Sequence, residues 1–224
     1  MKIIARIHTD FKEKLGIPRQ SGITDSLTAR IVFEPEFRVK EALRGIDGYS
    51  HLWLIWEFSE AKRDSWSPTV RPPRLGGNKR MGVFATRAPY RPNPIGLSSV
   101  RLLGIEHTEN EGDVLIVSGA DMLDGTPIYD IKPYLTFTDS HPDAKCGFAD
   151  EVVDYEIPVL VSDELLFRVE EGKRDALLTV LRGDPRPSYK NDSEYEYGMR
   201  FADYEVKFKV IEGQLCVTDI IKLK

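Results

Sequence analysis

The chain has 224 residues, enough for one substantial domain or for a medium domain with a small one, and enough to bury a core. Apolar residues make up 41% of the chain and charged residues 30%, which is typical of globular proteins and excludes a disordered or fibrous class. The formal net charge is −5, and a negative total by itself argues against a nucleic-acid partner.

The charged start of the sequence and its cysteines lead us to expect a cytoplasmic protein. Charges at Lys2, Arg6 and Asp10 interrupt any apolar run, so we expect neither a signal peptide nor a membrane-spanning segment. Cys146 and Cys216 lie outside any CxxC pattern, which argues against a disulfide framework or a thiolate zinc site. The four histidines lack HxxxH and HxH spacing, and we predict that no metal is bound.

The first half of the chain is predicted to consist of short strands joined by turns. Residues 51–58 form an almost unbroken apolar and aromatic run, typical of a strand buried on both faces. Residues 36–43 are expected to form one or two helical turns. No regular βαβ alternation is present, so a doubly wound sheet is disfavoured and a mainly β domain is expected. The predicted strands are residues 2–9, 30–33, 51–58, 82–86, 97–107 and 113–120.

A polar segment at residues 137–154 divides the chain. Pro142 and Gly147 break its periodicity, which makes it a candidate linker. We therefore expect a β domain at residues 1–144 and a small α+β domain at residues 155–224, docked on the first.

The small domain should contain one helix and a terminal hairpin. Apolar residues at helical spacing predict a helix over residues 162–182, with Ser162 as its N-cap and an interruption at Gly172. Residues 204–210 alternate between apolar and charged side chains, and Glu212-Gly213 supplies the turn before residues 215–223.

A basic stretch in the middle of the chain is the first indication of function. Six basic residues and no acidic residue lie between Arg71 and Arg91, a local charge opposite to that of the whole protein. Five prolines and four glycines in residues 69–98 fix the backbone at some points and permit close approach at others. Rigid loops that carry arginines suit anionic ligands. The alternative is that these loops only join strands and that their arginines are solvated.

Asn93-Pro94 lies within this stretch and offers hydrogen-bond acceptors. An amide side chain and a neighbouring carbonyl fixed by proline can both accept from an exocyclic amine, such as the N6 amine of adenine. Those bonds would direct the nitrogen lone pair at an electrophile without a strong base. The alternative is an asparagine that only caps a turn between two prolines.

Asp124-Gly125 predicts a tight turn between strands, with Thr126 and Asp130 at its rim. Backbone amides in such a turn could bind a nucleoside or an amino-acid group. An ordinary Asp-Gly hairpin turn explains the dipeptide as well.

After the predicted helix, Arg186, Tyr189 and Lys190 combine groups for phosphate contact and base stacking. The segment could equally be only a helix stop.

Several common catalytic motifs are absent from the sequence. It has no GxGxxG after a strand, no GxxxxGK[ST] and no GxSxG. Dinucleotide-linked redox chemistry, P-loop phosphoryl transfer, α/β-hydrolase chemistry and a Rossmann methyltransferase therefore lack their usual signatures.

Five segments together resemble one family. They are IPRQSG at residues 17–22, GYSHLWLIWEF at 48–58, TVRPPRLGGNKRMGVFATRAPYRPNPIGLS at 69–98, LDGTPIYDIKPY at 123–134 and DPRPSY at 184–189. This set resembles the TsaA-like or TrmO family of S-adenosylmethionine (SAM)-dependent methyltransferases, which act on N6-threonylcarbamoyladenosine at position 37 of tRNA. The similarity spans nearly the whole chain.

The resemblance implies a β-barrel methyltransferase domain rather than a Rossmann domain, in a homodimer that binds SAM near the dimer interface. The residues at matching positions are expected to contact SAM. They are Pro18, Arg19, Gln20, Ser59, Glu60, Arg87, Leu97, Asp124, Gly125, Thr126 and Pro127.

The remaining roles follow from the physical character of the residues. Asn93 is predicted to orient the target amine, and Arg91 to bind the threonylcarbamoyl carboxylate. The tRNA anticodon arm is expected to contact Arg71, Arg74, Lys79, Arg80, Arg186, Tyr189 and Lys190. Two alternatives stay open: a catalytically silent barrel that binds tRNA or a nucleoside, and methylation of a different small molecule.

Overall fold

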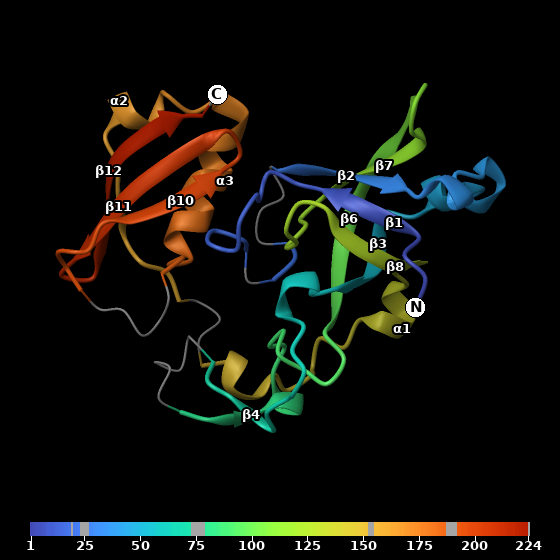
Figure 1. Cartoon of the computed structure of the whole chain (residues 1–224), viewed down its shortest axis with the longest axis horizontal. Helices are drawn as coiled ribbons and strands as arrows, with labels where there is room; N and C mark the ends of the chain where they lie inside the picture. The colour runs from blue at the N-terminus through green and yellow to red at the C-terminus, as the bar shows by residue number, and fades with distance from the viewer. Residues whose placement is uncertain (19, 23–26, 73–78, 152–154, 187–191, 224) are drawn as a thin grey trace.

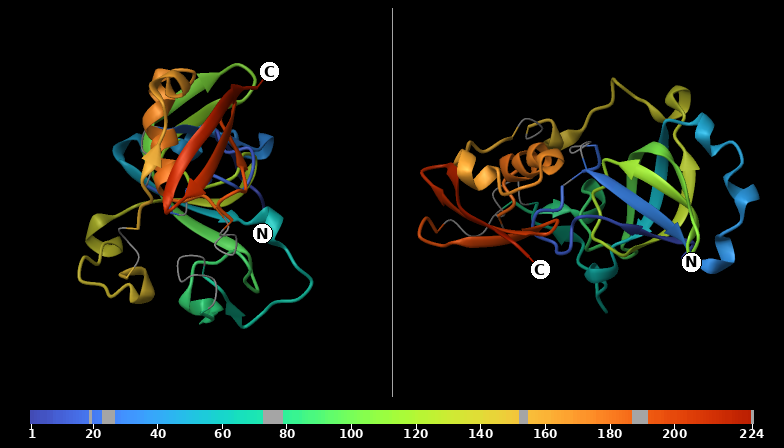
Figure 2. Two further views of the ribbon diagram at one scale, coloured as in Figure 1. Left: turned by 90° about the vertical axis from the view of Figure 1, so that its left-hand side faces the viewer. Right: turned by 90° about the horizontal axis from the view of Figure 1, so that it is seen from above.

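The computed structural model describes residues 1–18, 20–22, 27–72, 79–151, 155–186 and 192–223. Figure 1 shows two bodies side by side, a barrel of strands and a smaller sheet covered by a helix. The N-terminus lies on the barrel and the C-terminus on the smaller sheet. The view from above in Figure 2 separates the same two bodies.

Six strands close into a barrel in the order β1-β2-β7-β6-β3-β8. Every neighbouring pair is antiparallel, and β8 pairs with both β1 and β3. Closure leaves no strand of this sheet with an unpaired edge. The mainly β expectation is confirmed, although β8 was not among the predicted strands. The strands are β1 (Ala5–His8), β2 (Thr28–Phe33), β3 (His51–Glu57), β6 (Ile95–Thr108), β7 (Gly112–Ser118) and β8 (Thr126–Pro133).

Strand β3 alternates strictly between the barrel interior and its outer surface. Leu52, Leu54 and Trp56 are buried, while Trp53 and Ile55 are only half-buried. The prediction that this strand is buried on both faces is therefore wrong. The reason is that a barrel encloses one face of each strand, and the apolar residues of the other face remain on the outside.

A long excursion separates β3 from β6. It contains η4 (Ser59–Ala61), β4 (Thr69–Val70), β5 (Met81–Gly82) and η6 (Val83–Ala85). The strand predicted at residues 82–86 is wrong, because the chain turns into η6 as soon as β5 ends, with Thr86 N bonded to Val83 O at 3.2 Å.

Short turns account for the other irregular parts of the first body. The predicted helical turns at residues 36–43 are 3-10 turns, η1 (Pro35–Phe37) and η2 (Lys40–Leu43), followed by η3 (Ile46–Gly48). The candidate linker overlaps α1 (Thr136–Asp139) and η7 (Gly147–Ala149).

The second body is a four-stranded sheet in the order β10-β11-β12-β9. Its predicted terminal hairpin is confirmed: Tyr204, Val206, Phe208 and Val210 are buried on one face of β11. The turn after it is Glu212-Gly213, and both residues have positive φ. The strands are β9 (Val159–Leu160), β10 (Tyr197–Phe201), β11 (Tyr204–Ile211) and β12 (Gln214–Lys222).

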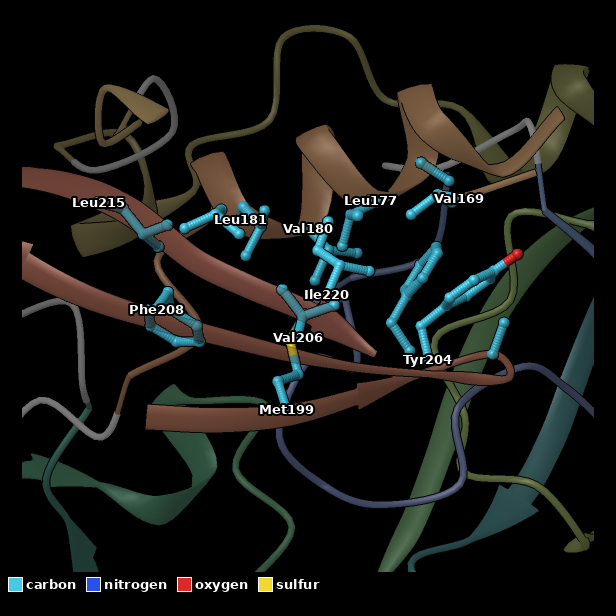
Figure 3. Packing of buried hydrophobic residues seen from close by; sticks show 14 of the residues in the cluster. Val169, Leu177, Val180, Leu181, Met199, Tyr204, Val206, Phe208, Leu215 and Ile220 are labelled. Carbon is cyan, nitrogen blue, oxygen red and sulfur yellow. The ribbon is translucent and has the colours of Figure 1, made fainter. Parts of the chain in front are cut away.

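The predicted single helix is two helices, α2 (Asp163–Leu166) and α3 (Glu171–Arg182). Ser162 is the expected N-cap, since its hydroxyl accepts a hydrogen bond from Leu165 N at 3.3 Å. The break precedes Gly172 instead of falling on it. Figure 3 shows α3 lying across the sheet, with Leu177, Val180 and Leu181 pointing into the core between them.

The segment after β1 joins the two bodies. Phe11 and Leu27, which precede β2, are buried in the core of the second body. Asp10 forms an ion pair with Lys173 of α3 at 3.1 Å, and its carbonyl accepts from Ala202 N at 3.0 Å. The expected docking agrees with these contacts, and the domain ranges 1–144 and 155–224 stay a prediction.

Candidate active site

One end of the barrel, which we call the mouth, gathers four connections, whose described residues are 9–18 with 20–22, 58–61, 83–94 and 119–125. Backbone hydrogen bonds join them in pairs. Gly22 N donates to Gly119 O at 2.9 Å, Asp124 N to Phe11 O at 2.8 Å, and Phe58 N to Pro94 O at 2.8 Å. Four of the five sequence segments that resemble the TrmO family have residues in these connections.

A chain of polar side chains lies beneath the mouth. Trp56 Nε1 donates to Ser98 Oγ at 3.0 Å, and Ser98 Oγ donates to Asp121 Oδ1 at 2.6 Å. Trp56 is 5% exposed and Ser98 is 1% exposed. Asp121 also accepts a hydrogen bond from the Ser21 backbone. This relay, Trp56–Ser98–Asp121, therefore links Ser21, in the loop before β2, to the buried Ser98 of β6.

Burial raises the pKa of Asp121, while the Ser98 hydrogen bond and the charge of Arg87 oppose the shift. Arg87 is exposed at the rim, and its Nη1 donates to Gln20 Oε1 at 2.6 Å. The structure thus brings together two residues that the resemblance assigns to SAM and sets a cation beside a partly buried carboxyl group.

Asn93 lies at the rim, on the exposed loop that leads into β6. Its backbone carbonyl accepts from Ile95 N at 2.8 Å, and the Pro94 carbonyl accepts from Phe58 N. The backbone carbonyls of Asn93 and Pro94 are therefore already engaged within the chain. Of the two acceptors that the sequence offered, the exposed side-chain amide of Asn93 is the one that remains for an incoming amine.

Arg91 helps to shape the same loop. Its Nη1 donates to Thr86 O at 2.7 Å and to Val83 O at 3.3 Å. The side chain is half-buried. In this geometry Nη1 of the guanidinium holds the loop in shape, and the other N–H groups of Arg91 can donate hydrogen bonds to an anion.

The Asp124 turn differs from the expectation. It is no hairpin turn, because the following strand β8 pairs with β1 and β3 and not with β7. Its amides are used internally: Asp124 N bonds Phe11 O, Gly125 N bonds Ile7 O at 2.8 Å and Thr126 N bonds Leu123 O at 3.2 Å. The amides of this turn therefore hold the mouth together and are not free to bind a nucleoside.

The Asp124 carboxylate is engaged as well. It accepts from Lys12 Nζ at 2.8 Å and from Thr9 N at 3.0 Å. Burial alone would raise the pKa of Asp124, but the hydrogen bond and charge of Lys12 outweigh burial and lower it. Thr126 and Pro127 are buried at the start of β8.

The other predicted SAM contacts are dispersed. Ser59 is exposed, and the neighbouring Glu60 forms an ion pair with Lys14 Nζ at 3.3 Å. Pro18 is half-buried in the loop that follows β1. Leu97 is 57% exposed on the outer face of β6 opposite Ile55, whereas its neighbours on β6 point inward. Within one chain, Leu97 is not brought to the other predicted contacts. Arg19 lies outside the described residues.

The predicted RNA contacts fall in two places. Arg71, Lys79 and Arg80 are exposed on the excursion between β3 and β6, and Arg74 lies outside the described residues. Arg186 donates from Nε and Nη2 to the two oxygens of Asp184, both at 2.8 Å, with 14% and 10% of the two side chains exposed. Arg186 thus stabilises its own turn. Tyr189 and Lys190 also lie outside the described residues.

Across the described ranges, no group of three or more histidine, cysteine, aspartate and glutamate residues is arranged to hold a metal ion. No helix in the same part of the chain is long and apolar enough to span a membrane.

Comparison with known proteins assigns the family. The tRNA-methyltransferase O N-terminal domain matches residues 6–140, and the TrmO C-terminal domain matches residues 156–223. The chain therefore belongs to the tRNA-methyltransferase O (TrmO) family.

Named relatives and solved structures are similar over most of their length. The tRNA (adenine(37)-N6)-methyltransferase of Escherichia coli is 39% identical over 94% of this chain and 92% of its own. The Eikenella corrodens protein of the same name is 43% identical over 79% of this chain and 99% of its own. A crystal structure of TrmO from Pseudomonas aeruginosa superposes with a TM-score of 0.76 at 35% identity, covering 98% of this chain and 94% of that one.

Trp56, Ser98 and Asp121 are not among the site residues that the sequence predicts. Trp56 lies within a recognised motif, Ser98 is the last residue of another, and Asp121 comes two residues before a third, so their positions were the only signal in the sequence. Their contact depends on barrel closure, since 42 residues separate Trp56 from Ser98 and 23 separate Ser98 from Asp121.

Proposed function

We propose that this protein transfers a methyl group from SAM to N6 of adenine 37 in tRNA. The observation that carries the proposal is the contact between Gln20 and Arg87, which brings two separate family motifs together at the mouth and sets Arg87 beside the Asp121 carboxyl group. The relatives from Escherichia coli and Eikenella corrodens are both named tRNA (adenine(37)-N6)-methyltransferase, which describes the same reaction.

The residues at the mouth fit the chemistry of SAM. The exposed guanidinium of Arg87 suits its carboxylate, and the Asp121 carboxyl group suits hydroxyl or ammonium donors. Relatives from Pseudomonas aeruginosa and Pyrococcus abyssi are named as a putative SAM-dependent methyltransferase and a probable SAM-binding protein. When bound, SAM supplies a methyl group that is already electrophilic.

The chain itself needs to position the acceptor amine. The exposed side-chain oxygen of Asn93 accepts a hydrogen bond from N6 and directs the nitrogen lone pair along the line of attack. The nitrogen–carbon bond forms as the carbon–sulfur bond breaks, and the N6 proton then leaves to water. No covalent nucleophile takes part in this scheme.

We also propose that the adenosine at position 37 carries a threonylcarbamoyl group when it is methylated. A threonylcarbamoyl group on N6 carries a carboxylate, and Arg91 lies two residues from Asn93 with guanidinium donors beyond the one that closes its loop. Because Arg91 can bind this carboxylate, threonylcarbamoyladenosine 37 is the preferred methyl acceptor in this proposal.

A cytoplasmic homodimer is also proposed. Apolar side chains on the outer face of β6 are exposed, namely Ile95 at 36%, Leu97 at 57% and Leu103 at 50%. A second copy covering this face would bury them and would bring Leu97 into a site shared by two chains. Light scattering of the purified protein should give twice the chain mass; a monomer at assay concentrations contradicts the dimer.

Two measurements test the reaction. Calorimetry should show that the protein binds SAM, and tritiated methyl groups should enter tRNA that carries threonylcarbamoyladenosine faster than tRNA that lacks it. SAM binding distinguishes an enzyme from a silent RNA-binding barrel. Equal methylation of both tRNAs contradicts the threonylcarbamoyl preference, and no methylation of either contradicts the reaction.

A further inference from the structure

Two large aromatic rings are exposed on the excursion between β3 and β6. Trp66 is 53% exposed and Phe84 is 73% exposed, and they lie next to each other with ring centroids 6.1 Å apart and planes inclined by 34°. Exposed apolar rings that are paired in this way are typical of a surface that meets a partner.

A third aromatic ring in the excursion, that of Tyr90, makes a cation–π contact with an arginine. Tyr90 is 41% exposed, and the guanidinium carbon of Arg63 lies 3.9 Å from the centre of its ring. The exposed cations Arg71, Lys79 and Arg80 belong to the same excursion. Aromatic faces and positive charges therefore occur together on one segment of an otherwise acidic protein.

Hydrogen bonds fix this segment relative to the mouth. Val83, next to Phe84, is 1% exposed, and its amide donates to Pro68 O at 2.9 Å, two residues beyond Trp66. Arg91 then donates to Val83 O, and Phe58 N holds the Pro94 carbonyl. The rings are thus tied through short links to the loop that carries Asn93, and Figure 1 shows the segment projecting from the barrel around β4.

We propose that Trp66 and Phe84, together with Tyr90, form a stacking platform for unpaired RNA bases that flank the base entering the mouth. Proteins recognise single-stranded loops chiefly by stacking bases on aromatic side chains, while neighbouring cations contact phosphates. The inference rests on the proposed function, because it takes the RNA to be the substrate. It gives a role to Trp66, Phe84 and Tyr90, none of which is among the RNA contacts predicted from the sequence.

The platform predicts a distinct binding signature. A lost stacking contact weakens binding without changing the number of counterions released, whereas a lost phosphate contact also reduces the slope of log affinity against log salt. The aromatic and basic residues of the excursion are therefore separable by salt titration.

The experiment uses the full chain and an anticodon stem-loop RNA. The double variant Trp66→Ala/Phe84→Ala should bind this RNA about tenfold or more weakly with an unchanged salt slope. Phe167→Ala is the control, because Phe167 is 64% exposed, comparable with Trp66 and Phe84, but lies on the second body. A duplex of the stem alone, which has no unpaired bases, should bind wild type and double variant equally.

Fluorescence supplies a second readout. Of the three tryptophans, Trp56 is buried and Trp53 is half-buried and bonded to Asp139, so quenching by the stem-loop should come from Trp66. Trp66→Phe should keep most of the affinity and lose the quenching, because phenylalanine still offers a ring face.

Two results overturn the platform: wild-type affinity of the double variant for the stem-loop, or a change from dimer to monomer in that variant by light scattering, which makes the rings a contact between copies of this chain. A different result would contradict the proposed methyl transfer without contradicting the platform. If wild-type protein binds the stem-loop through these rings but methylates no tRNA, then the platform stands and the methyl transfer does not.

Discussion

At the scale of single residues, the mouth depends on the balance of charge around Asp121. Burial raises the pKa of this carboxyl group, and Arg87 and Ser98 oppose that effect. Arg87 in turn contacts Gln20 on a different loop. One exposed arginine therefore influences both the loop geometry and the charge of the site.

Arg87→Ala should weaken SAM binding about tenfold, because it removes a charge-assisted contact to the cofactor carboxylate at an exposed position. Calorimetric titration with SAM measures the effect. Arg182→Ala, which removes an exposed arginine from α3, is the control and should leave the dissociation constant unchanged. An unchanged constant for Arg87→Ala refutes the assignment of Arg87 to SAM.

Asn93→Ala should leave folding and SAM affinity nearly intact and lower the methylation rate by up to about 100-fold, because the lost acceptor aligns the target amine and not the cofactor. Single-turnover methylation of tRNA with saturating SAM measures the rate. A variant that methylates at the wild-type rate shows that Asn93 does not orient the amine.

At the scale of elements, the Trp56–Ser98–Asp121 relay depends on Gly96. Because Gly96 has no side chain, the backbone of β6 can lie against the Trp56 ring. A Cβ atom at Gly96 would lie 2.2 Å from the Trp56 ring, a distance that forces the indole to move. The same indole donates to Ser98 and packs against Phe58 with centroids 4.2 Å apart.

Gly96→Ala should therefore destabilise the fold by about 1–3 kcal/mol through overpacking and disturb the Trp56–Ser98 bond. Gly104→Ala on the same strand is the matched control, since a Cβ there meets no atom within 4 Å, and it should change stability by less than about 0.5 kcal/mol. Urea unfolding of both variants measures the difference; equal effects contradict the packing argument.

The turn after α3 depends on a buried ion pair. Asp184 has a φ of 51°, in the left-handed region, and its carboxylate receives Arg186 and the Tyr155 hydroxyl. Burial alone would raise the pKa of Asp184, but the hydrogen bond and charge of Arg186 outweigh burial and lower it.

Asp184→Asn should reduce the free energy of unfolding by about 2 kcal/mol at pH 7. Because the pKa in the folded state lies below the unfolded value, the stabilisation is complete above about pH 4 and is lost as the pH falls through the folded pKa. The gap between wild type and variant in urea unfolding should narrow as the pH falls below about 4. A gap that stays constant between pH 7 and pH 3 contradicts a role for the charge.

At the scale of the whole molecule, an acidic protein has one segment whose positive charge is not balanced by acidic residues. The net charge is −5, yet no acidic residue lies between Arg71 and Arg91. Such an asymmetry attracts a polyanion to one face and repels it from the rest.

Reversing Lys79 and Arg80 to glutamate should weaken tRNA binding at low salt and flatten its salt dependence by up to about two in slope, with SAM affinity unchanged. Lys207→Glu/Lys209→Glu on β11 changes the net charge equally and is the control. If both double variants lose affinity equally, net charge explains the effect. If the excursion variant binds with the wild-type slope, these residues do not contact phosphate.

Local features of the chain were determined by sequence alone. The terminal hairpin, the Ser162 cap and most barrel strands were predicted because their signals lie within a few neighbouring residues. The long motif at residues 69–98 indicated the family for the same reason, since it is contiguous.

The tertiary structure alone decided which side chains meet. From its residue type, Arg186 was predicted to contact phosphate, but in the folded chain it forms an ion pair with Asp184. The backbone amides at Asp124 were predicted to bind a nucleoside, but they form hydrogen bonds within the chain at the mouth. The Trp56–Ser98–Asp121 relay exists only once the barrel closes. The physical reason is that such contacts depend on strand order and register, which no short stretch of the chain encodes.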